Sequence, residues 1–370
     1  MTIIKLGDVA IEAKSSNKGD KTGCKIVGLE HLTPSDVTLS AWSDDTNNSF
    51  TKEFSRGDVL FGRRRAYLKK AAVAPFDGIC SGDITVIRAK EGKVDPQLLP
   101  FIIQNDYLFE FAVGKSAGSL SPRVKWEHLK NFEITLPDMK KQKMLADTLW
   151  SINQTKQAYI ALINQTDELV KSQFIEMFGT EDNPSSGVEF ERLGDLASYV
   201  NGFAFKPADW GTKGLPIIRI QNLTGSGVEF NYYDGEYPEQ VEVNDGDVLI
   251  SWSASLGVYL WNKGTAILNQ HIFKVVFDKK TIDKYFFMYA VQQKLDEMGD
   301  KSHGSTMKHI VKKAFDNIKI PYPEDRRQVS FSELVKQSDK SKFELQDAID
   351  NLDALSKKII AENLIASGKE

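Results

Sequence analysis

The stretch KKQKMLADTLWSINQTKQAYIALINQTDELVKSQFIEMF, residues 140–178, decides the fold of this chain. Its apolar residues alternate at spacings of four and three, the pattern of a coiled-coil seam, with polar breaks such as Lys156. No Pro or Gly interrupts the stretch before Gly179, a typical helix stop. At ~1.5 Å per residue, such a helix is roughly 57 Å long. It is too long to be buried inside one compact domain, so it needs a partner helix.

The partner helix is predicted in the same chain. Phe331 repeats the position of Leu145, and Lys342 repeats the lysine break at Lys156, each 186 positions later. The globular regions repeat as well. Three pairs of segments align: Lys5-Leu-Gly-Asp-Val-Ala10 with Arg192-Leu-Gly-Asp-Leu-Ala197, Gly57-Asp-Val-Leu60 with Gly246-Asp-Val-Leu249, and residues 131–137 with 317–323. The chain is therefore a tandem duplication of a globular domain followed by a long helix.

These patterns predict an α+β protein. We expect two mixed α/β domains in tandem repeat, each followed by a long α-helix, with the two helices packing as an antiparallel coiled coil. The predicted boundaries are 1–137 for the first domain, 138–179 for the first long helix, 180–323 for the second domain with its N-terminal linker, and 324–370 for the second long helix. In the first domain, residues 97–111 are predicted to form one helix.

Composition limits the function. The chain has 370 residues and a net charge of −4, so any positive charge that attracts nucleic acid must be local. Cys24 and Cys80 are too few for a disulfide framework and fit a reducing cytoplasm, where we expect the protein to be located. No apolar run approaches membrane-spanning length, and we expect no membrane partner.

Motifs for catalysis are incomplete. Gly114-Lys115-Ser116 looks like the end of a phosphate-binding loop, but Phe109 occupies the place of the required upstream glycine. The five His residues show no metal-ligand spacing. We therefore predict a non-catalytic chain that binds neither a metal ion nor a cofactor.

Local positive charge is concentrated between two predicted strands. The segment 62–70 carries five cations, and no acidic residue occurs between Asp58 and Asp77. Such side chains contact phosphates or guanine edges, whereas a solvated basic turn is the alternative. The candidate contact residues of the first domain include those of a second polar, basic loop at 119–125, and they are Arg63, Arg64, Arg65, Tyr67, Lys69, Lys70, Ser121, Arg123 and Lys125.

The equivalent loops of the second domain differ in chemistry. They offer hydroxyl, indole, amide and imidazole groups in place of most of the arginines, although Trp252 also suits a core position. The scaffold is repeated while the loops diverge, which fits two modules that recognise different targets. The candidate contact residues here are Arg219, Ser251, Trp252, Ser253, Ser255, Asn269, Gln270, His271, Ser305, Lys308, His309 and Lys312.

The whole chain resembles the specificity subunit of a type I restriction-modification system. The resemblance is carried by Gly57-Asp-Val-Leu-Phe-Gly-Arg-Arg-Arg65, Gly78-Ile-Cys-Ser-Gly-Asp83, Ser121-Pro-Arg-Val-Lys-Trp126, Phe174-Ile-Glu-Met-Phe-Gly179, Ile250-Ser-Trp-Ser-Ala-Ser-Leu-Gly257, Leu268-Asn-Gln-His-Ile-Phe273 and His303-Gly-Ser-Thr-Met307. Each of these segments is weak evidence by itself, and together they are strong.

The resemblance implies a function. Two target-recognition domains would each read one half of an asymmetric bipartite site in double-stranded DNA. The coiled coil would set the spacing and dock two methyltransferase (modification) subunits, which motor-nuclease (restriction) subunits join. S-adenosylmethionine, ATP and magnesium would be bound by those partners. The alternative is a coiled-coil scaffold that bridges two protein-binding domains without contacting DNA.

Overall fold

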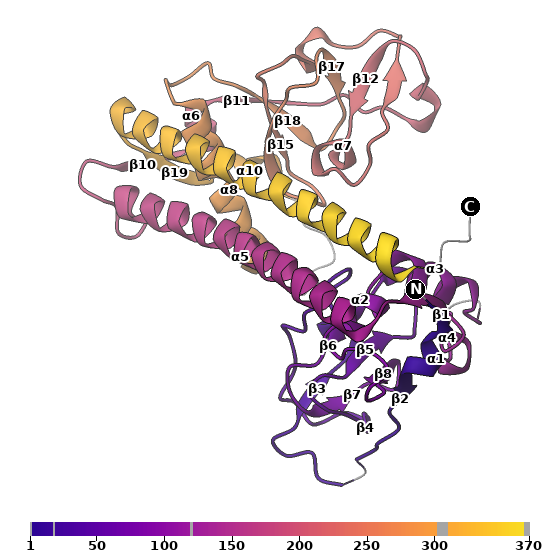
Figure 1. The fold of residues 1–370 in the computed structure, drawn as a ribbon. Coiled ribbons are helices and arrows are strands. Elements are labelled where there is room, and N and C mark those ends of the chain that lie inside the picture. Colours follow the sequence, from indigo (N-terminus) through magenta and orange to yellow (C-terminus); the bar gives the residue numbers. More distant parts are fainter. Residues whose placement is uncertain (1, 18, 119–120, 302–309, 366–370) are drawn as a thin grey trace. The chain divides into compact units, whose positions relative to one another are not determined.

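The computed structural model describes residues 2–17, 19–118, 121–301 and 310–365. The chain divides into two units: unit 1 is Met1–Ala161 with Leu345–Glu370, and unit 2 is Leu162–Glu344. Two long helices, α5 (Met139–Phe178) and α10 (Asp325–Leu364), each belong partly to unit 1 and partly to unit 2 (Figure 1). None of the helices in the described ranges is long and apolar enough to cross a membrane.

Unit 1 is built on short strands. An antiparallel sheet has the order β2 (Ala10–Glu12), β8 (Ile84–Ala89), β5 (Val59–Gly62) and β6 (Ala71–Val73). A second sheet has the order β3 (Lys25–Val27), β7 (Gly78–Cys80) and β4 (Lys52–Phe54), and β1 (Thr2–Lys5) pairs with β9 (Glu133–Leu136). The short helices are α1 (Leu6–Val9), η1 (Leu29–His31), η2 (Ala66–Leu68), α2 (Leu99–Ile103), α3 (Asp106–Gly114) and α4 (Trp126–Leu129).

Unit 2 repeats this arrangement with one additional strand, β13. Its antiparallel sheet has the order β11 (Ser198–Asn201), β18 (Ile272–Val276), β15 (Val248–Ser251) and β16 (Gly257–Leu260). The second sheet has the order β13 (Asn231–Tyr233), β12 (Leu215–Ile218), β17 (Ala266–Leu268) and β14 (Glu242–Val243), and β10 (Glu189–Arg192) pairs with β19 (Lys319–Tyr322). The helices are α6 (Leu193–Leu196), η3 (Pro207–Asp209), α7 (Ile220–Thr224), η4 (Glu239–Val241), α8 (Lys284–Lys301) and α9 (Lys312–Asp316).

A glycine lies two residues after β1 and, at the equivalent place of the repeat, two residues after β10. A Cβ atom on Gly7 would lie 2.9 Å from the Cβ of Lys130, and one on Gly194 would lie 3.1 Å from the Cβ of Asp316. Both distances are shorter than ordinary van der Waals contact, so a side chain at either position would force the neighbouring segment to shift. The glycine in each Leu-Gly-Asp segment is therefore explained by close backbone approach.

The two long helices are antiparallel within each unit. In unit 1, Leu149 of α5 is buried in one core with Ile360 and Leu364 from the end of α10. In unit 2, Phe178 at the end of α5 packs against Phe331 near the start of α10, with 5.5 Å between ring centroids. The predicted fold class, with mixed α/β domains in tandem and paired antiparallel helices, is confirmed.

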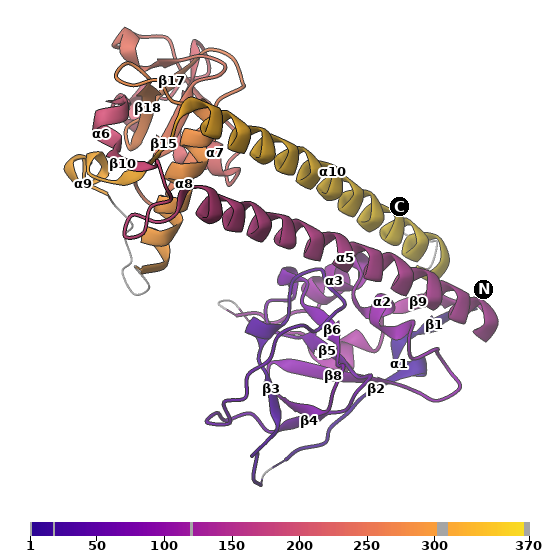
Figure 2. The same ribbon diagram turned by 90° about the vertical axis from the view of Figure 1, so that its left-hand side faces the viewer.

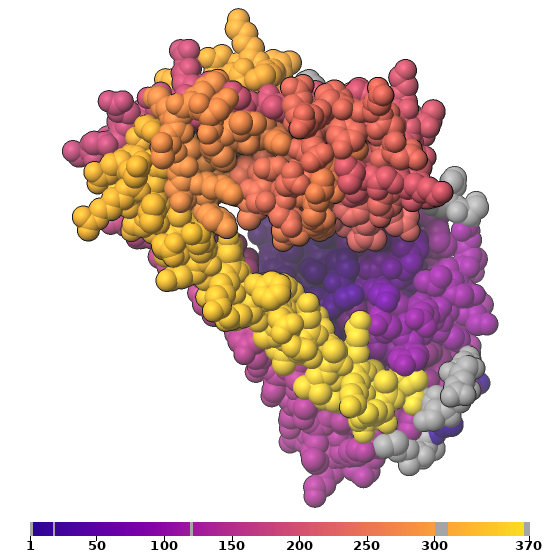
Figure 3. All heavy atoms as spheres, turned by 90° about the horizontal axis from the view of Figure 1, so that it is seen from above, coloured from indigo at the N-terminus to yellow at the C-terminus, as the bar shows by residue number. Residues whose placement is uncertain are grey.

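The long helices also pack on the domains. In unit 1, α5 passes over α2 and α3 (Figure 2), where Trp150 contacts Phe101 at 5.0 Å and donates its Nε1–H to the Gln97 carbonyl. α10 is visible at the surface in the space-filling view (Figure 3), and Phe343 of this helix is 76% exposed. On α5, Leu169 is 56% exposed. Each long helix thus has a buried side and an exposed, free side.

One predicted helix is wrong. Residues 97–111 form two helices, because the chain leaves α2 after Ile103 and starts α3 at Asp106. The side chain of Asn105 accepts a hydrogen bond from the Leu108 N–H at 2.9 Å and so caps the start of α3. The periodic apolar residues bridge this break, which is why the pattern suggested one continuous helix.

Candidate functional site

Three segments of unit 1 meet at the end of β5. The Arg63 N–H donates to the Asp83 carbonyl at 2.9 Å, and the Arg63 carbonyl accepts from the Val124 N–H at 3.0 Å. The Arg65 N–H donates to the Pro122 carbonyl at 2.8 Å. These backbone bonds bring together two basic segments, 63–65 and 121–125, that are far apart in the sequence.

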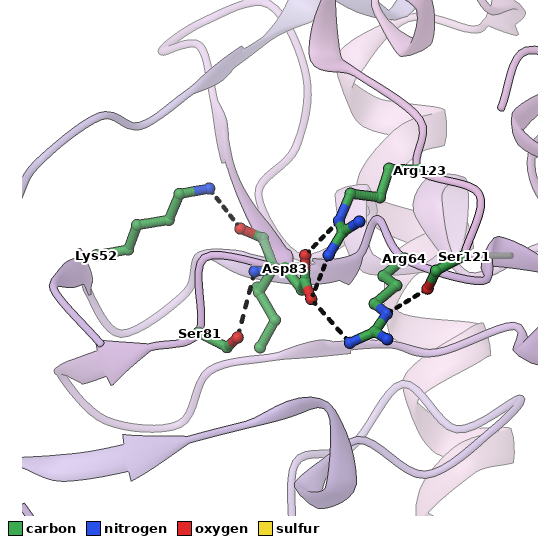
Figure 4. A network of polar contacts seen from close by, with 7 residues as sticks. Lys52, Arg64, Ser81, Asp83, Ser121 and Arg123 are labelled. Carbon is green, nitrogen blue, oxygen red and sulfur yellow. Dashed lines mark hydrogen bonds and ion pairs between the residues drawn. The ribbon is translucent and has the colours of Figure 1, made fainter. Parts of the chain in front are cut away.

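The side chains at this junction form a network around Asp83 (Figure 4). Arg123 donates to its carboxylate through Nε at 2.7 Å and Nη2 at 3.3 Å, and Arg64 donates through Nη1 at 3.4 Å. Arg64 Nε also donates to the Ser121 hydroxyl at 2.5 Å. The hydrogen bond from Arg123 is the main reason that the pKa of Asp83 is lowered, and the charges of both arginines add to it. Asp83 is therefore ionised at neutral pH.

Lys52 lies at the edge of the same network. Its Nζ donates to the carbonyl of Ile84 at 2.6 Å, and burial lowers its pKa. The Asp83 N–H donates to the Ser81 hydroxyl at 3.2 Å, which holds the residue from its backbone side (Figure 4). Asp83 is thus fixed through both its backbone and its side chain.

The charge of the segment 62–70 is more compensated than its sequence suggests. Lys69 forms an ion pair with Asp106 at 2.5 Å, and the Lys70 ammonium donates to the Leu29 carbonyl at 2.8 Å. Arg64 and Lys69 thus have acidic partners from distant segments, which the absence of acidic residues between Asp58 and Asp77 did not reveal. Arg65 is exposed and forms no ion pair with any described residue.

The rest of this group is accessible at the surface. Tyr67 is 54% exposed, and Lys125 is exposed at the start of α4. Arg63 is half-buried.

Arg65 and Lys69, which flank η2, have φ angles of 54° and 51° and so occupy the left-handed region. This conformation is uncommon for residues other than glycine, and here it ends the short helix on both sides.

Unit 2 contains the same backbone junction with other side chains. The Trp252 N–H donates to the His271 carbonyl at 3.2 Å, and the Trp252 carbonyl accepts from the Ile310 N–H at 3.0 Å. Trp252 therefore stands where Arg63 stands in unit 1, and His271 stands where Asp83 stands. The Trp252 ring stacks on Phe273 with 5.4 Å between centroids. Its half-buried position fits both a packing role and a surface contact.

Two candidates in unit 2 are engaged within the domain. Ser251 is fully buried and donates its hydroxyl hydrogen to the Ser255 carbonyl, so its side chain is engaged inside unit 2, and its contact with DNA stays a prediction. Lys312 forms an ion pair with Asp316 at 2.8 Å, which compensates its charge.

The other candidates of unit 2 occupy several loops. The Arg219 guanidinium lies 5.0 Å from the Trp210 ring centroid. Ser255 is exposed, whereas Ser253 is half-buried like the three residues between β17 and β18, which are Asn269, Gln270 and His271. Ser305, Lys308 and His309 lie outside the described residues.

Metal-ligating side chains and cysteine thiols are two further kinds of candidate in the described residues. Within the described ranges, no group of three or more His, Cys, Asp or Glu side chains is arranged to hold a metal ion. Cys24 and Cys80 are free thiols, and burial raises the pKa of Cys80 to about 12, so this thiol stays protonated at neutral pH.

The central residue of the unit 1 network was missed as a candidate. Asp83 lies at the end of the segment 78–83 that carries the family resemblance, but a lone aspartate between strands has no distinctive pattern. Its partners, Arg64 and Arg123, are 19 and 40 positions away in the sequence. Only the folded chain shows that these three residues form one group.

The sequence of this chain is similar to those of known proteins. A family model described as the type I restriction modification DNA specificity domain matches residues 1–167 and 185–362. The type I restriction enzyme EcoBI specificity subunit of Escherichia coli is 27% identical over 160 residues, which cover 42% of this chain and 34% of that protein. The MjaVIII specificity subunit of Methanocaldococcus jannaschii is 29% identical over 150 residues, 38% of this chain and 34% of that protein. The chain spans about a third of the length of these relatives.

Two solved structures resemble the fold. One comes from work on complex assembly and conformational transition of the type I R-M system; it has a TM-score of 0.58 and 20% identity, covering 98% of this chain and 96% of that chain. The other is the S subunit of a type I restriction-modification system from M. genitalium, with a TM-score of 0.55 and 15% identity over 97% of this chain and 95% of that chain. At these identities the likeness concerns the fold.

Proposed function

The chain belongs to the family of type I restriction-modification DNA specificity domains, and from this premise we propose that it recognises a specific sequence in double-stranded DNA. The observation that carries the proposal is the repeated junction. The same backbone hydrogen bonds hold Arg63, Asp83 and Val124 in unit 1 and Trp252, His271 and Ile310 in unit 2. A constant frame that presents different side chains is what two reading modules of different specificity require.

We propose that each unit reads one half of a bipartite site. Unit 1 presents the guanidinium of Arg63 and the carboxylate of Asp83, whereas unit 2 presents the indole of Trp252 and the imidazole of His271 at the equivalent places. These groups differ in hydrogen-bonding capacity, so the two half-sites should differ in sequence. The recognised site is then asymmetric.

Electrostatic attraction to the phosphates must come from local charges. The chain has a net charge of −4, but Arg65 and Lys125 are exposed and form no ion pair among the described residues. Exposed basic side chains next to the junction suit phosphate contacts that position the duplex without reading its sequence.

The free sides of the long helices suit partner subunits. Leu169 and Leu355 are equivalent in the repeat and are 56% and 46% exposed, one in each unit. Two equivalent apolar positions fit two copies of one partner. We propose that methyltransferase subunits dock on these helices, and that motor-nuclease subunits join the complex. This chain then contributes specificity. S-adenosylmethionine, ATP and magnesium are bound by the partner subunits, and the complex works in the cytoplasm.

Selection from random DNA tests the function. The full-length chain, alone and assembled with methyltransferase subunits, is mixed with a pool of random-sequence duplexes, and the bound fraction is sequenced. We expect two blocks of fixed sequence separated by a constant number of unspecified base pairs, with affinity falling as salt rises because phosphate contacts release counterions. A scaffold that bridges two other proteins would select no DNA sequence and show no binding to duplexes.

A further inference from the structure

We propose that Arg64, Asp83 and Arg123 together read one G·C base pair through the major groove of the half-site that unit 1 recognises, an inference that rests on the proposed DNA recognition. Asp83 is the positioning residue for the two arginines. It also offers an acceptor of its own to the base pair.

The hydrogen-bond inventory leaves donors for the base. Arg64 uses Nε on Ser121 and Nη1 on Asp83, and Arg123 uses Nε and Nη2 on Asp83. Among the described residues, each guanidinium therefore uses two of its five N–H donors and keeps three. Guanine presents the acceptors O6 and N7 in the major groove, and the paired cytosine presents its N4 amino donor. Arginine donors beside a carboxylate match this edge, with the carboxylate opposite the cytosine amino group.

The mixture of donors and an acceptor in the cluster favours a base pair over a phosphate. Two guanidinium groups and one carboxylate leave a net charge of about +1, which attracts DNA in general. A phosphate has no donor for the carboxylate, whereas a G·C edge offers acceptors to the arginines and an amino donor to the carboxylate. The lowered pKa keeps Asp83 ionised and hence able only to accept hydrogen bonds. The neighbouring exposed Arg65 lacks a carboxylate partner among the described residues and suits the phosphate role.

The cluster is accessible and prearranged. The side chains of Arg64, Asp83 and Arg123 are 39%, 22% and 43% exposed. Arg64 and Arg123 face each other in an isolated antiparallel bridge, and the Asp83 carbonyl accepts from the N–H of Arg63, the residue before Arg64. The Ser121 hydroxyl and the Asp83 carboxylate fix the directions of the guanidinium planes (Figure 4). Arginines that are already oriented lose less side-chain freedom on binding. Unit 2 has His271 at the place of Asp83, so this way of reading belongs to unit 1.

The experiment is selection from the random-duplex pool with the full-length chain and three variants, at two salt concentrations. Asp83→Asn keeps the shape of the side chain and removes its charge. Arg64→Lys keeps a positive charge and loses the planar fork. Glu191→Gln, which removes the carboxylate paired with Lys280 at 2.6 Å in unit 2, is the matched control. Thermal unfolding of each variant checks that it is folded.

We expect one position to respond. The wild-type chain should select a G·C pair there, and Asp83→Asn and Arg64→Lys should each reduce that preference by about 10- to 100-fold, as for loss of a bidentate contact. The other positions and the salt dependence should stay as in the wild type, and Glu191→Gln should select the wild-type motif.

Two results would overturn the inference while leaving DNA recognition intact: an unchanged preference at every position in both variants, or a uniform loss of affinity with a shallower salt dependence, which is the behaviour of phosphate contacts. If the wild-type chain selects no sequence at all, the proposed function fails and the inference fails with it.

Discussion

The Nζ of Lys156 lies 2.7 Å from a carboxylate oxygen of Asp353, and this ion pair joins α5 to α10 within unit 1. Unit 2 contains the same pair with the helices exchanged: Lys342 of α10 lies 2.7 Å from Asp167 of α5. The lysines are equivalent in the repeat, and so are the aspartates. The lysines that interrupt the apolar seam thus have fixed partners across it, which favours one antiparallel register over others.

Charge reversal at this pair should be repaired by a charge swap. Asp353→Lys places two cations together and should lower the free energy of unfolding of unit 1 by about 1 kcal/mol. Lys156→Asp combined with Asp353→Lys should recover most of that loss. Urea unfolding of the full chain measures both, with Glu362→Lys on the exposed side of α10 as control. A double variant that is as unstable as the sum of the two single variants would contradict the register role.

A buried glutamine at the start of each long helix should be important for stability. Gln142 accepts from the Asp95 N–H at 2.9 Å and donates to the Pro137 carbonyl at 2.9 Å. Gln328 makes the equivalent bonds with Asp283, at 2.8 Å, and Pro323, at 2.7 Å. Replacing either glutamine with leucine leaves two backbone groups unpaired, and we expect a loss of about 1–3 kcal/mol.

Denaturant unfolding of Gln142→Leu and Gln328→Leu checks this prediction. The control is Gln346→Leu, because Gln346 is exposed on α10. Unfolding midpoints that match the control would show that these two bonds do not hold the helix onto its domain.

The pH dependence of stability should reveal the role of Asp106. Lys69 donates to it at 2.5 Å and Lys357 lies 3.1 Å from its other oxygen; the hydrogen bond from Lys69 is the main cause of its lowered pKa. A carboxyl group whose pKa is lower in the folded state stabilises the fold above its unfolded pKa of about 4, and this contribution is lost as the pH falls through the folded value.

Asp106→Asn should therefore destabilise the protein at pH 7 and progressively less below pH 4. Thermal unfolding of the wild type and the variant across this range gives the difference. An equal difference at every pH would mean that the ion pairs of Asp106 contribute nothing that depends on its charge.

Exchange of one recognition domain should change one half-site. Replacing residues 1–137 with the same region of a relative exchanges the loops that carry Arg64, Asp83 and Arg123 and leaves unit 2 unaltered. Mapping the methylated sequence in cells that carry the complete system should show one new block and one old block. If both blocks change, the two units do not read DNA independently.

Helix length should set the distance between the two blocks. The boundary between the two units falls inside the long helices. It lies between Ala161 and Leu162 in α5 and between Glu344 and Leu345 in α10. Seven residues inserted at both places keep the heptad pattern and the contacts inside each unit, and they add ~10 Å of helix. This corresponds to about three base pairs, at ~3.4 Å per step.

The same insertion also rotates one half-site by roughly 100° around the duplex, at ~10.5 base pairs per turn. We therefore expect a longer spacer, weaker binding and unchanged block sequences. Mapping methylated adenines in cells with the insertion variant gives the spacer length. A wild-type spacer with full activity would rule out the helices as the measure of distance.

The sequence by itself determined the architecture, because its signals are periodic and lie along the chain. The alternating spacing of 140–178 and its recurrence 186 positions later were sufficient to predict two domains and two long helices that pair with each other. Helical periodicity depends only on which neighbouring residues face the same side, so it can be read without the fold. The same reasoning failed at Asn105, where one capping side chain divides a periodic stretch into two helices.

Only the tertiary structure decided which side chains form the candidate site. Segment 62–70 appeared uncompensated, yet Asp83 and Asp106 neutralise Arg64 and Lys69 from elsewhere in the chain. Ser251, a predicted contact, is buried with its hydroxyl engaged. Hydrogen bonds and ion pairs depend on distances of a few ångströms between residues that are remote in sequence, and backbone pairing between strands and loops creates those distances. The grouping of Arg64, Asp83 and Arg123 therefore exists only in the folded domain.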